Sequence, residues 1–113
     1  MAKHDPGLSR TFHALADPTR RAILTRLAGE SARVTELAGP TGLRLPTVMR
    51  HLSVLEKAGL ISTTKEGRIR TCAIVPEALD PVQSWLAEQR TIWEARLDRL
   101  DSFLMRVTKE RKK

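Results

Sequence analysis

One stretch of the sequence, residues 45–61 (LPTVMRHLSVLEKAGLI), carries side chains of the types that contact nucleic acids. Arg50 presents a planar fork of donors, and arginine is the commonest bidentate partner of the guanine edge in the major groove. Thr47 could meet a base or a phosphate, while Met49 offers only apolar contact, for example with a thymine methyl group. His51 could either pack inside the protein or face a phosphate. The stretch is therefore a helix that reads DNA or one helix of an ordinary core.

Other kinds of chemistry lack the residues that they need. Cys72 is the only cysteine, which excludes an intrachain disulfide and a zinc site built on several thiolates. The sequence has no nucleophile elbow, phosphate loop or paired-carboxylate spacing, so we expect that the protein is not an enzyme. Glu94, Asp98 and Asp101 have no histidine beside them, and we interpret them as solvated residues. We expect no cofactor and no metal, and we expect Cys72 to fill the core, with a redox role as the alternative.

The charge balance favours a polyanionic partner. The chain has 20 Lys+Arg against 13 Asp+Glu, a formal net charge of +7 and a pI near 10.5. Solubility alone could also explain a positive charge. The N-terminal MAKHDPGLSR has no apolar region of a signal peptide, and no run approaches the roughly 18 apolar residues of a membrane span. We expect a cytoplasmic protein without a membrane partner.

Short helices should position the residues of the 45–61 stretch. Apolar residues at helical spacing predict a first helix over residues 8–16, and Asp17-Pro18 starts a second helix that ends at Gly29. A third, very short helix is expected after a Thr35 cap, before Gly39 and Pro40 stop it. Pro46 then opens the next helix and Gly59 closes it, so the two helices and their turn form a helix-turn-helix signature.

The helix over residues 46–58 should have one buried face and one exposed face. Val48, Leu52 and Leu55 recur at i, i+4 and i+7, which is the spacing of a buried stripe. The small, polar or cationic residues of the other face are Pro46, Thr47, Met49, Arg50 and Ser53, with His51 at the boundary. They are concentrated in the first two turns, which is the part of a recognition helix that enters the major groove.

A β-hairpin should follow over residues 61–75. The segment is rich in Ile, Val and Thr in near alternation and is broken at Lys65-Glu66-Gly67-Arg68. Its basic residues Lys65, Arg68 and Arg70 could reach phosphates or the minor groove, although one of the two arginines could face inward. Which arginine faces DNA stays open.

The last helix, expected over residues 80–107, has an apolar seam. Leu86, Trp93, Leu100 and Val107 lie seven apart, and Leu97 and Leu104 form a second line. A helix of this length spans about 40 Å, more than a small domain covers, so the rest should pair with a second copy. The alternative is that this helix binds a different protein.

These segments resemble a known family. FHALADPTRRAILTRLA, VTELAGPTGLRLPTVMRHLSVLEKAGLI and KEGRIR are similar to the ArsR-type winged helix-turn-helix repressors, and RTIWEARLDRLDSFL resembles the branch without metal ligands. The resemblance covers roughly residues 8–104 and implies a homodimer that pairs through its first and last helices and represses transcription from a palindromic operator. Members often have serine where this chain has Arg44 and Met49, so the helix cap and the operator cannot be taken from relatives.

The sequence thus predicts a mainly α fold with a small β-hairpin wing, in the order α-α-α-α-β-β-α, as one DNA-binding domain over residues 1–113. Helices 8–16 and 80–107 should form the homodimer. The predicted contacts with double-stranded DNA are Arg44, Pro46, Thr47, Met49, Arg50, His51, Ser53, Lys65, Arg68 and Arg70. The predicted dimer contacts are Leu8, Phe12, Leu15, Leu86, Trp93, Leu97, Leu100 and Leu104. A repressor that responds to a small-molecule or redox inducer is a further alternative.

Overall fold

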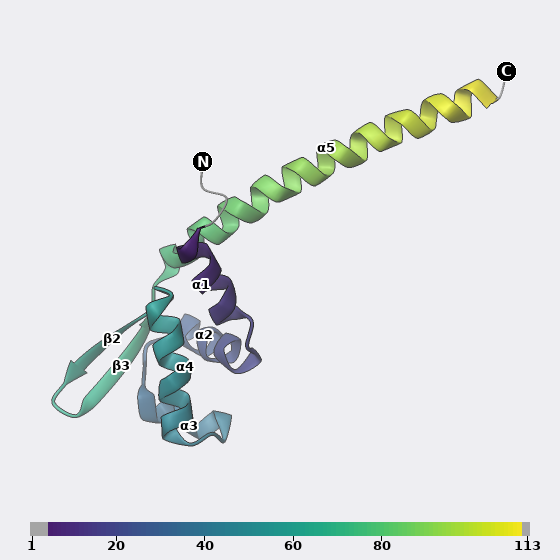
Figure 1. Ribbon diagram of the computed structural model, residues 1–113. Coiled ribbons are helices and arrows are strands. Elements are labelled where there is room, and N and C mark those ends of the chain that lie inside the picture. Colours follow the sequence, from purple (N-terminus) through teal and green to yellow (C-terminus); the bar gives the residue numbers. More distant parts are fainter. Residues whose placement is uncertain (1–4, 112–113) are drawn as a thin grey trace. The chain divides into compact units, whose positions relative to one another are not determined.

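The computed structural model describes residues 5–111, and the chain divides into two compact units that meet in sequence at Leu79 and Asp80 (Figure 1). The helices of the first unit are α1 (Pro6–Leu15), α2 (Pro18–Gly29), α3 (Val34–Thr41), α4 (Leu45–Lys57) and the short 3-10 helix η1 (Pro76–Leu79). Its strands are β1 (Ala32–Arg33), β2 (Ile61–Glu66) and β3 (Ile69–Ile74). The second unit is the helix α5 (Asp80–Arg111). The predicted mainly α fold with a β-hairpin wing is confirmed, with β1 and η1 added to the predicted order.

Aspartates begin the first two helices. Asp5 Oδ1 accepts hydrogen bonds from the amides of Gly7 and Leu8 at 3.0 and 3.2 Å, so α1 begins two residues before the predicted position. Asp17 Oδ2 accepts from the amide of Arg20 at 3.0 Å and caps α2, as the Asp-Pro signal predicts.

The prediction for the third helix was wrong in two respects. Its N-cap is Arg33 instead of Thr35, and Glu36 Oε1 accepts a hydrogen bond from the Arg33 amide at 3.1 Å. The helix also continues through Gly39 and Pro40, because a proline near the end of a short helix removes only one intrahelical bond. Gly42, at φ 69°, provides the left-handed residue that ends it.

The three strands form an antiparallel sheet in the order β1-β3-β2. Ala32 pairs with Cys72, and the hairpin register runs from Ile61 opposite Ile74 to Glu66 opposite Ile69. Strand β2 therefore includes Lys65 and Glu66, and the turn is shorter than the predicted break. Gly67 adopts a φ of 61° in this turn, a conformation that glycine accepts without steric cost.

The core of the first unit lies between its helices and the inner face of the sheet. Each helix from α1 to α4 contributes to it, as do the start of β2 and the middle of β3. The buried residues of this core are Ala14, Ile23, Leu27, Ala32, Val34, Leu37, Val48, Leu52, Leu55, Leu60, Ile61 and Cys72. The predicted buried stripe of α4 is thus confirmed.

Helix α5 runs four residues beyond its predicted end at residue 107. It carries a row of large apolar side chains that remain exposed in the single chain. The row includes five residues of the predicted seam, each 49–61% exposed: Leu86, Trp93, Leu97, Leu100 and Leu104. Within residues 5–111, none of the helices has the length and apolar character that crossing a membrane requires.

Candidate nucleic-acid interface

Helix α4 presents its beginning and one of its faces to solvent. Burial of Val48, Leu52 and Leu55 fixes the rotation of the helix, so the residues between them point outward. Pro46, Met49, Arg50 and Ser53 are exposed and Thr47 is half-buried. The predicted exposed face is therefore present, while its contact with DNA stays a prediction.

The beginning of α4 has no side-chain cap. Arg44 is the N-cap residue, and its side chain makes no capping hydrogen bond, as its chemistry predicts. Instead, the Arg44 carbonyl accepts from the amides of Thr47 and Val48 at 3.0 and 3.1 Å. Because Pro46 has no amide hydrogen and the amides of Thr47 and Val48 are already bonded, it is the positive end of the helix dipole that favours an anion such as a phosphate near Arg44.

The wing places like charges directly opposite each other. Lys65 on β2 lies opposite Arg70 on β3. Each is two residues from a member of another opposed pair, Thr63 and Cys72. Because residues two apart on a strand share a face, Lys65 and Arg70 lie on the same face of the hairpin as the buried Cys72. Like charges at opposed positions destabilise a sheet, and a polyanion would relieve their repulsion.

A basic groove of about 450 Å³ lies between α3, α4 and the wing. Leu45 and Met49 form part of its wall on the α4 side, and Val34 and Thr35 line it at α3. Its basic residues are Arg33, Lys65, Arg68 and Arg70. Both wing arginines therefore border the same groove as the exposed face of α4. Arg70 also lines a second cleft of about 250 Å³ beside Ser53 and Cys72.

Arg33 is a candidate contact that the sequence interpretation missed. It ends the two-residue strand β1, and its pairing with Thr71 brings it beside the wing. A two-residue strand has no periodicity from which it could be predicted. The available signal was only a basic residue three positions before Glu36, with which Arg33 forms an exposed ion pair at 3.9 Å.

A hydrogen bond joins the wing to α4. The Thr63 hydroxyl on β2 donates to Glu56 Oε2 at 2.8 Å. On the other side, the same hydroxyl lies 3.8 Å from Cys72 Sγ. Burial raises the pKa of the Cys72 thiol, so the group stays protonated and weakly nucleophilic. This environment supports the core-filling interpretation of Cys72.

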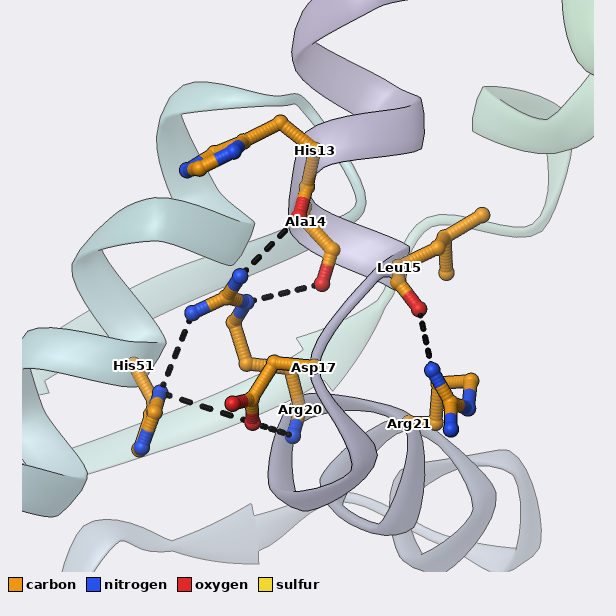
Figure 2. A network of polar contacts seen from close by, with 7 residues as sticks. All are labelled: His13, Ala14, Leu15, Asp17, Arg20, Arg21 and His51. Atoms are coloured by element: carbon orange, nitrogen blue, oxygen red, sulfur yellow. Dashed lines mark hydrogen bonds and ion pairs between the residues drawn. The ribbon is translucent and has the colours of Figure 1, made fainter.

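The structure favours the packed alternative for His51. Its side chain is only 17% exposed, and its Nδ1 lies 3.3 Å from Arg20 Nη1 and 4.0 Å from Asp17 Oδ2 (Figure 2). His51 therefore packs toward the beginning of α2, which is the packed alternative of the sequence interpretation. Arg20 was missed because its role depends on contacts with residues distant in sequence.

The dimer residues expected on α1 differ in their burial. Leu15 is partly buried against the core of its own unit, and its part in a dimer stays a prediction. The buried residues of α1 are Thr11 and Ala14, each one position before a predicted dimer contact, Phe12 or Leu15. Phe12 is exposed and Leu8 half-buried, and their part in a dimer stays a prediction.

Metal-ligating groups do not gather in the part of the chain that the structure describes. Between residues 5 and 111, no three His, Cys, Asp or Glu side chains come together as a metal site requires. Glu94 of α5 instead forms an exposed i, i+4 ion pair with Arg90 at 3.3 Å.

Comparisons with known proteins agree with this architecture. A family model described as a helix-turn-helix domain matches residues 15–64. The crystal structure of an ArsR family transcriptional regulator, RHA00566, is 51% identical, with a TM-score of 0.78 over 83% of this chain and 97% of that one. The solution structure of a homodimeric winged helix-turn-helix DNA-binding domain, Mb0332 from Mycobacterium bovis, is 26% identical, with a TM-score of 0.59 over 88% and 95% of the two chains.

A curated relative has a similar description. The HTH-type transcriptional regulator Rv2034 from Mycobacterium tuberculosis is 41% identical over 70 residues, which are 62% of this chain and 65% of the relative. The match thus spans slightly less than two thirds of that regulator.

Proposed function

Because the chain belongs to the ArsR family of winged helix-turn-helix transcriptional regulators, we propose that it binds an inverted-repeat operator as a homodimer and represses transcription. The family consists of transcriptional regulators, not of enzymes. The observation that carries the proposal is the exposed face of α4, which includes Arg50, beside a groove lined by Arg33, Arg68 and Arg70.

Base reading and phosphate binding fall to different residues in this proposal. Arg50 donates two hydrogen bonds to a guanine edge, and Met49 makes apolar contact with a neighbouring base. Thr47 and Ser53 contact a base or the backbone. Lys65, Arg68, Arg70 and Arg33 neutralise phosphates and fix the protein on the duplex without selecting its sequence.

The exposed row on α5 supports pairing of two chains. Monomeric proteins rarely leave a continuous row of leucines and tryptophans in water, so Leu97, Leu100 and Leu104 indicate a partner helix. The structural relative Mb0332 is described as homodimeric. Two reading helices related by a twofold axis enter successive major grooves about 34 Å apart, so the operator should be an inverted repeat. Repression then follows from occupation of the promoter, without a metal cofactor.

A second candidate function uses the same exposed row differently. The seam of α5 could bind a helix of another protein, and the basic surface would then serve solubility. A self-dimer in solution favours the repressor, whereas a monomer favours this interaction module.

The proposed function is tested by letting the purified protein select duplexes from a random pool and sequencing them. We expect enrichment of one inverted repeat whose half-sites are centred about one helical turn apart. Selected and random DNA of equal length are then compared in a titration at fixed salt, because the salt concentration sets the nonspecific affinity. A pool that remains unenriched after repeated rounds would rule out sequence-specific binding.

A further inference from the structure

The Arg20 side chain connects three helices of the first unit, and we propose that it is a positioning residue for DNA reading. Its hydrogen bonds connect α4, through His51, to the end of α1, and we call this connection the tether. The tether holds the Arg50 side chain in the orientation that contacts a base. The inference rests on the proposed function, since it names a residue that controls operator affinity without touching DNA.

Three contacts of Arg20 carry the inference (Figure 2). Its Nε donates to the carbonyl of Ala14 at 2.7 Å, and its Nη2 donates to the carbonyl of His13 at 2.9 Å. These carbonyls belong to the last turn of α1, where the His13 carbonyl also accepts from the amide of Ala16 at 3.2 Å. The third contact joins Arg20 Nη1 to His51 Nδ1 on α4 at 3.3 Å. One guanidinium therefore joins α2, α1 and α4.

The third contact determines which nitrogen of His51 carries the proton. A guanidinium only donates hydrogen bonds, so the Nδ1 that faces it must accept. The proposal therefore assigns the ring proton of His51 to Nε2. The alternative is a protonated Nδ1 paired with Asp17, but Asp17 Oδ2 lies 4.0 Å away and already accepts from the Arg20 amide at 3.0 Å. The shorter contact favours the accepting form of the ring.

Asp17 keeps Arg20 in place at the beginning of α2. The hydrogen bond from the Arg20 amide, together with the positive charge of the Arg20 guanidinium, holds the pKa of Asp17 below its usual value. The carboxylate therefore remains charged beside the guanidinium at neutral pH. Asp17, Arg20 and His51 thus form one polar cluster at the junction of α1, α2 and α4.

The cluster matters for reading because His51 directly follows Arg50 on a rigid helix. His51 points to the interior while Arg50 is exposed, so any rotation that releases His51 also displaces the Arg50 guanidinium. Bidentate base contacts tolerate errors of only about 0.5 Å and 10–20°. Loss of the tether should therefore reduce affinity for the selected operator more than affinity for random DNA.

Arg21 offers a matched control. Its Nη1 donates to the carbonyl of Leu15 at 2.8 Å, so it also joins α2 to the end of α1, but this hydrogen bond does not involve α4 (Figure 2). Arg21→Gln removes a similar bond from the same helix end and leaves the His51 contact in place. A difference between Arg20→Gln and Arg21→Gln thus reports on the connection to α4.

Operator titrations provide the first test. We expect Arg20→Gln to raise Kd for the selected operator about tenfold, from the loss of hydrogen bonds to a charged group, with a smaller change on random DNA. Arg21→Gln should change both by less than about threefold. His51→Phe, which fills the space without an acceptor, should resemble Arg20→Gln, whereas His51→Gln supplies an accepting oxygen and should restore most of the affinity. Equal behaviour of His51→Phe and His51→Gln, or of the two arginine variants, would overturn the positioning role.

Nitrogen NMR of the His51 ring gives a second test that requires no DNA. The wild-type protein at neutral pH should show an unprotonated Nδ1 and a protonated Nε2, and Arg20→Gln should shift the balance between the two forms. A protonated Nδ1 in the wild-type protein would overturn the tether even if the protein binds its operator. Failure of the wild-type protein to select any duplex would instead overturn the proposed function, and the ring signal would still decide whether the tether exists.

Discussion

A substitution of Arg50 can distinguish base reading from phosphate binding. We expect Arg50→Ala to weaken operator binding by about 1–3 kcal/mol and to relax the preference at one base position, because a bidentate contact is lost. Lys65→Ala, the matched loss of a wing cation, should weaken operator and random DNA alike. Fluorescence anisotropy with both duplexes at one salt concentration measures the two effects. Equal losses on both duplexes for Arg50→Ala would remove it as a base reader.

Asp17 links stability to pH through its lowered pKa. Its native carboxylate is held charged mainly by the Arg20 amide, so its contribution to stability is present above the unfolded value near 3.8 and disappears as the pH falls through the native value. We expect the stability difference between the wild-type protein and Asp17→Ala to be larger at pH 7 than at pH 3.

Urea unfolding at the two pH values measures this difference. Asp17→Asn provides the comparison, because asparagine can still cap α2 but carries no charge. It should retain part of the neutral-pH stability and lose the pH dependence. A wild-type advantage that stays the same at both pH values would contradict the role of the charge.

At the scale of elements, the hydrogen bond between Thr63 and Glu56 couples the wing to the reading helix. Thr63→Val keeps the shape but removes the donor, and we expect it to lower the free energy of unfolding by about 0.5–1.5 kcal/mol. Thr64→Val is the control, since Thr64 is exposed on the opposite face of the strand. Urea unfolding of both variants tests this coupling, and similar losses would argue against it.

Local signals predicted most elements correctly, whereas distant contacts did not show in the sequence. The Asp17-Pro18 cap, the buried stripe of α4 and the hairpin each rest on neighbouring residues, and all are present. Strand β1 exists only because Arg33 and its neighbour pair with β3, and no local pattern indicates a strand of two residues. The continuation of α3 through Pro40 was missed because a proline in the last turn removes only one intrahelical bond and need not end the helix.

For the candidate site, too, local spacing could be predicted and contacts between distant residues could not. The outward face of α4 could be predicted because helical spacing fixes which residues are buried. The directions of His51 and Leu15 could not be predicted because each lies at the edge of a face, where only the neighbouring helices decide its direction. The sequence also could not reveal that Arg33 and Arg70 border one groove, because their proximity depends on strand pairing.

For the whole molecule, the exposed row of α5 is the feature that a second copy should cover. We expect light scattering to give about twice the chain mass of 12.7 kDa for the wild-type protein. Leu100→Glu places a charge in the predicted seam and should give a monomer with weak operator binding. Met105→Glu is the control, since Met105 is 73% exposed on the same helix but outside the seam. Dissociation by both variants, or by neither, would contradict the proposed pairing.

Hydroxyl-radical footprinting of the wild-type protein on its selected duplex tests most directly whether two α4 helices read one operator. We predict two protected backbone regions on the same side of the DNA, centred about 34 Å apart and related by the symmetry of the inverted repeat. A single protected region, or two regions on opposite sides of the duplex, would contradict reading by a symmetric pair of α4 helices.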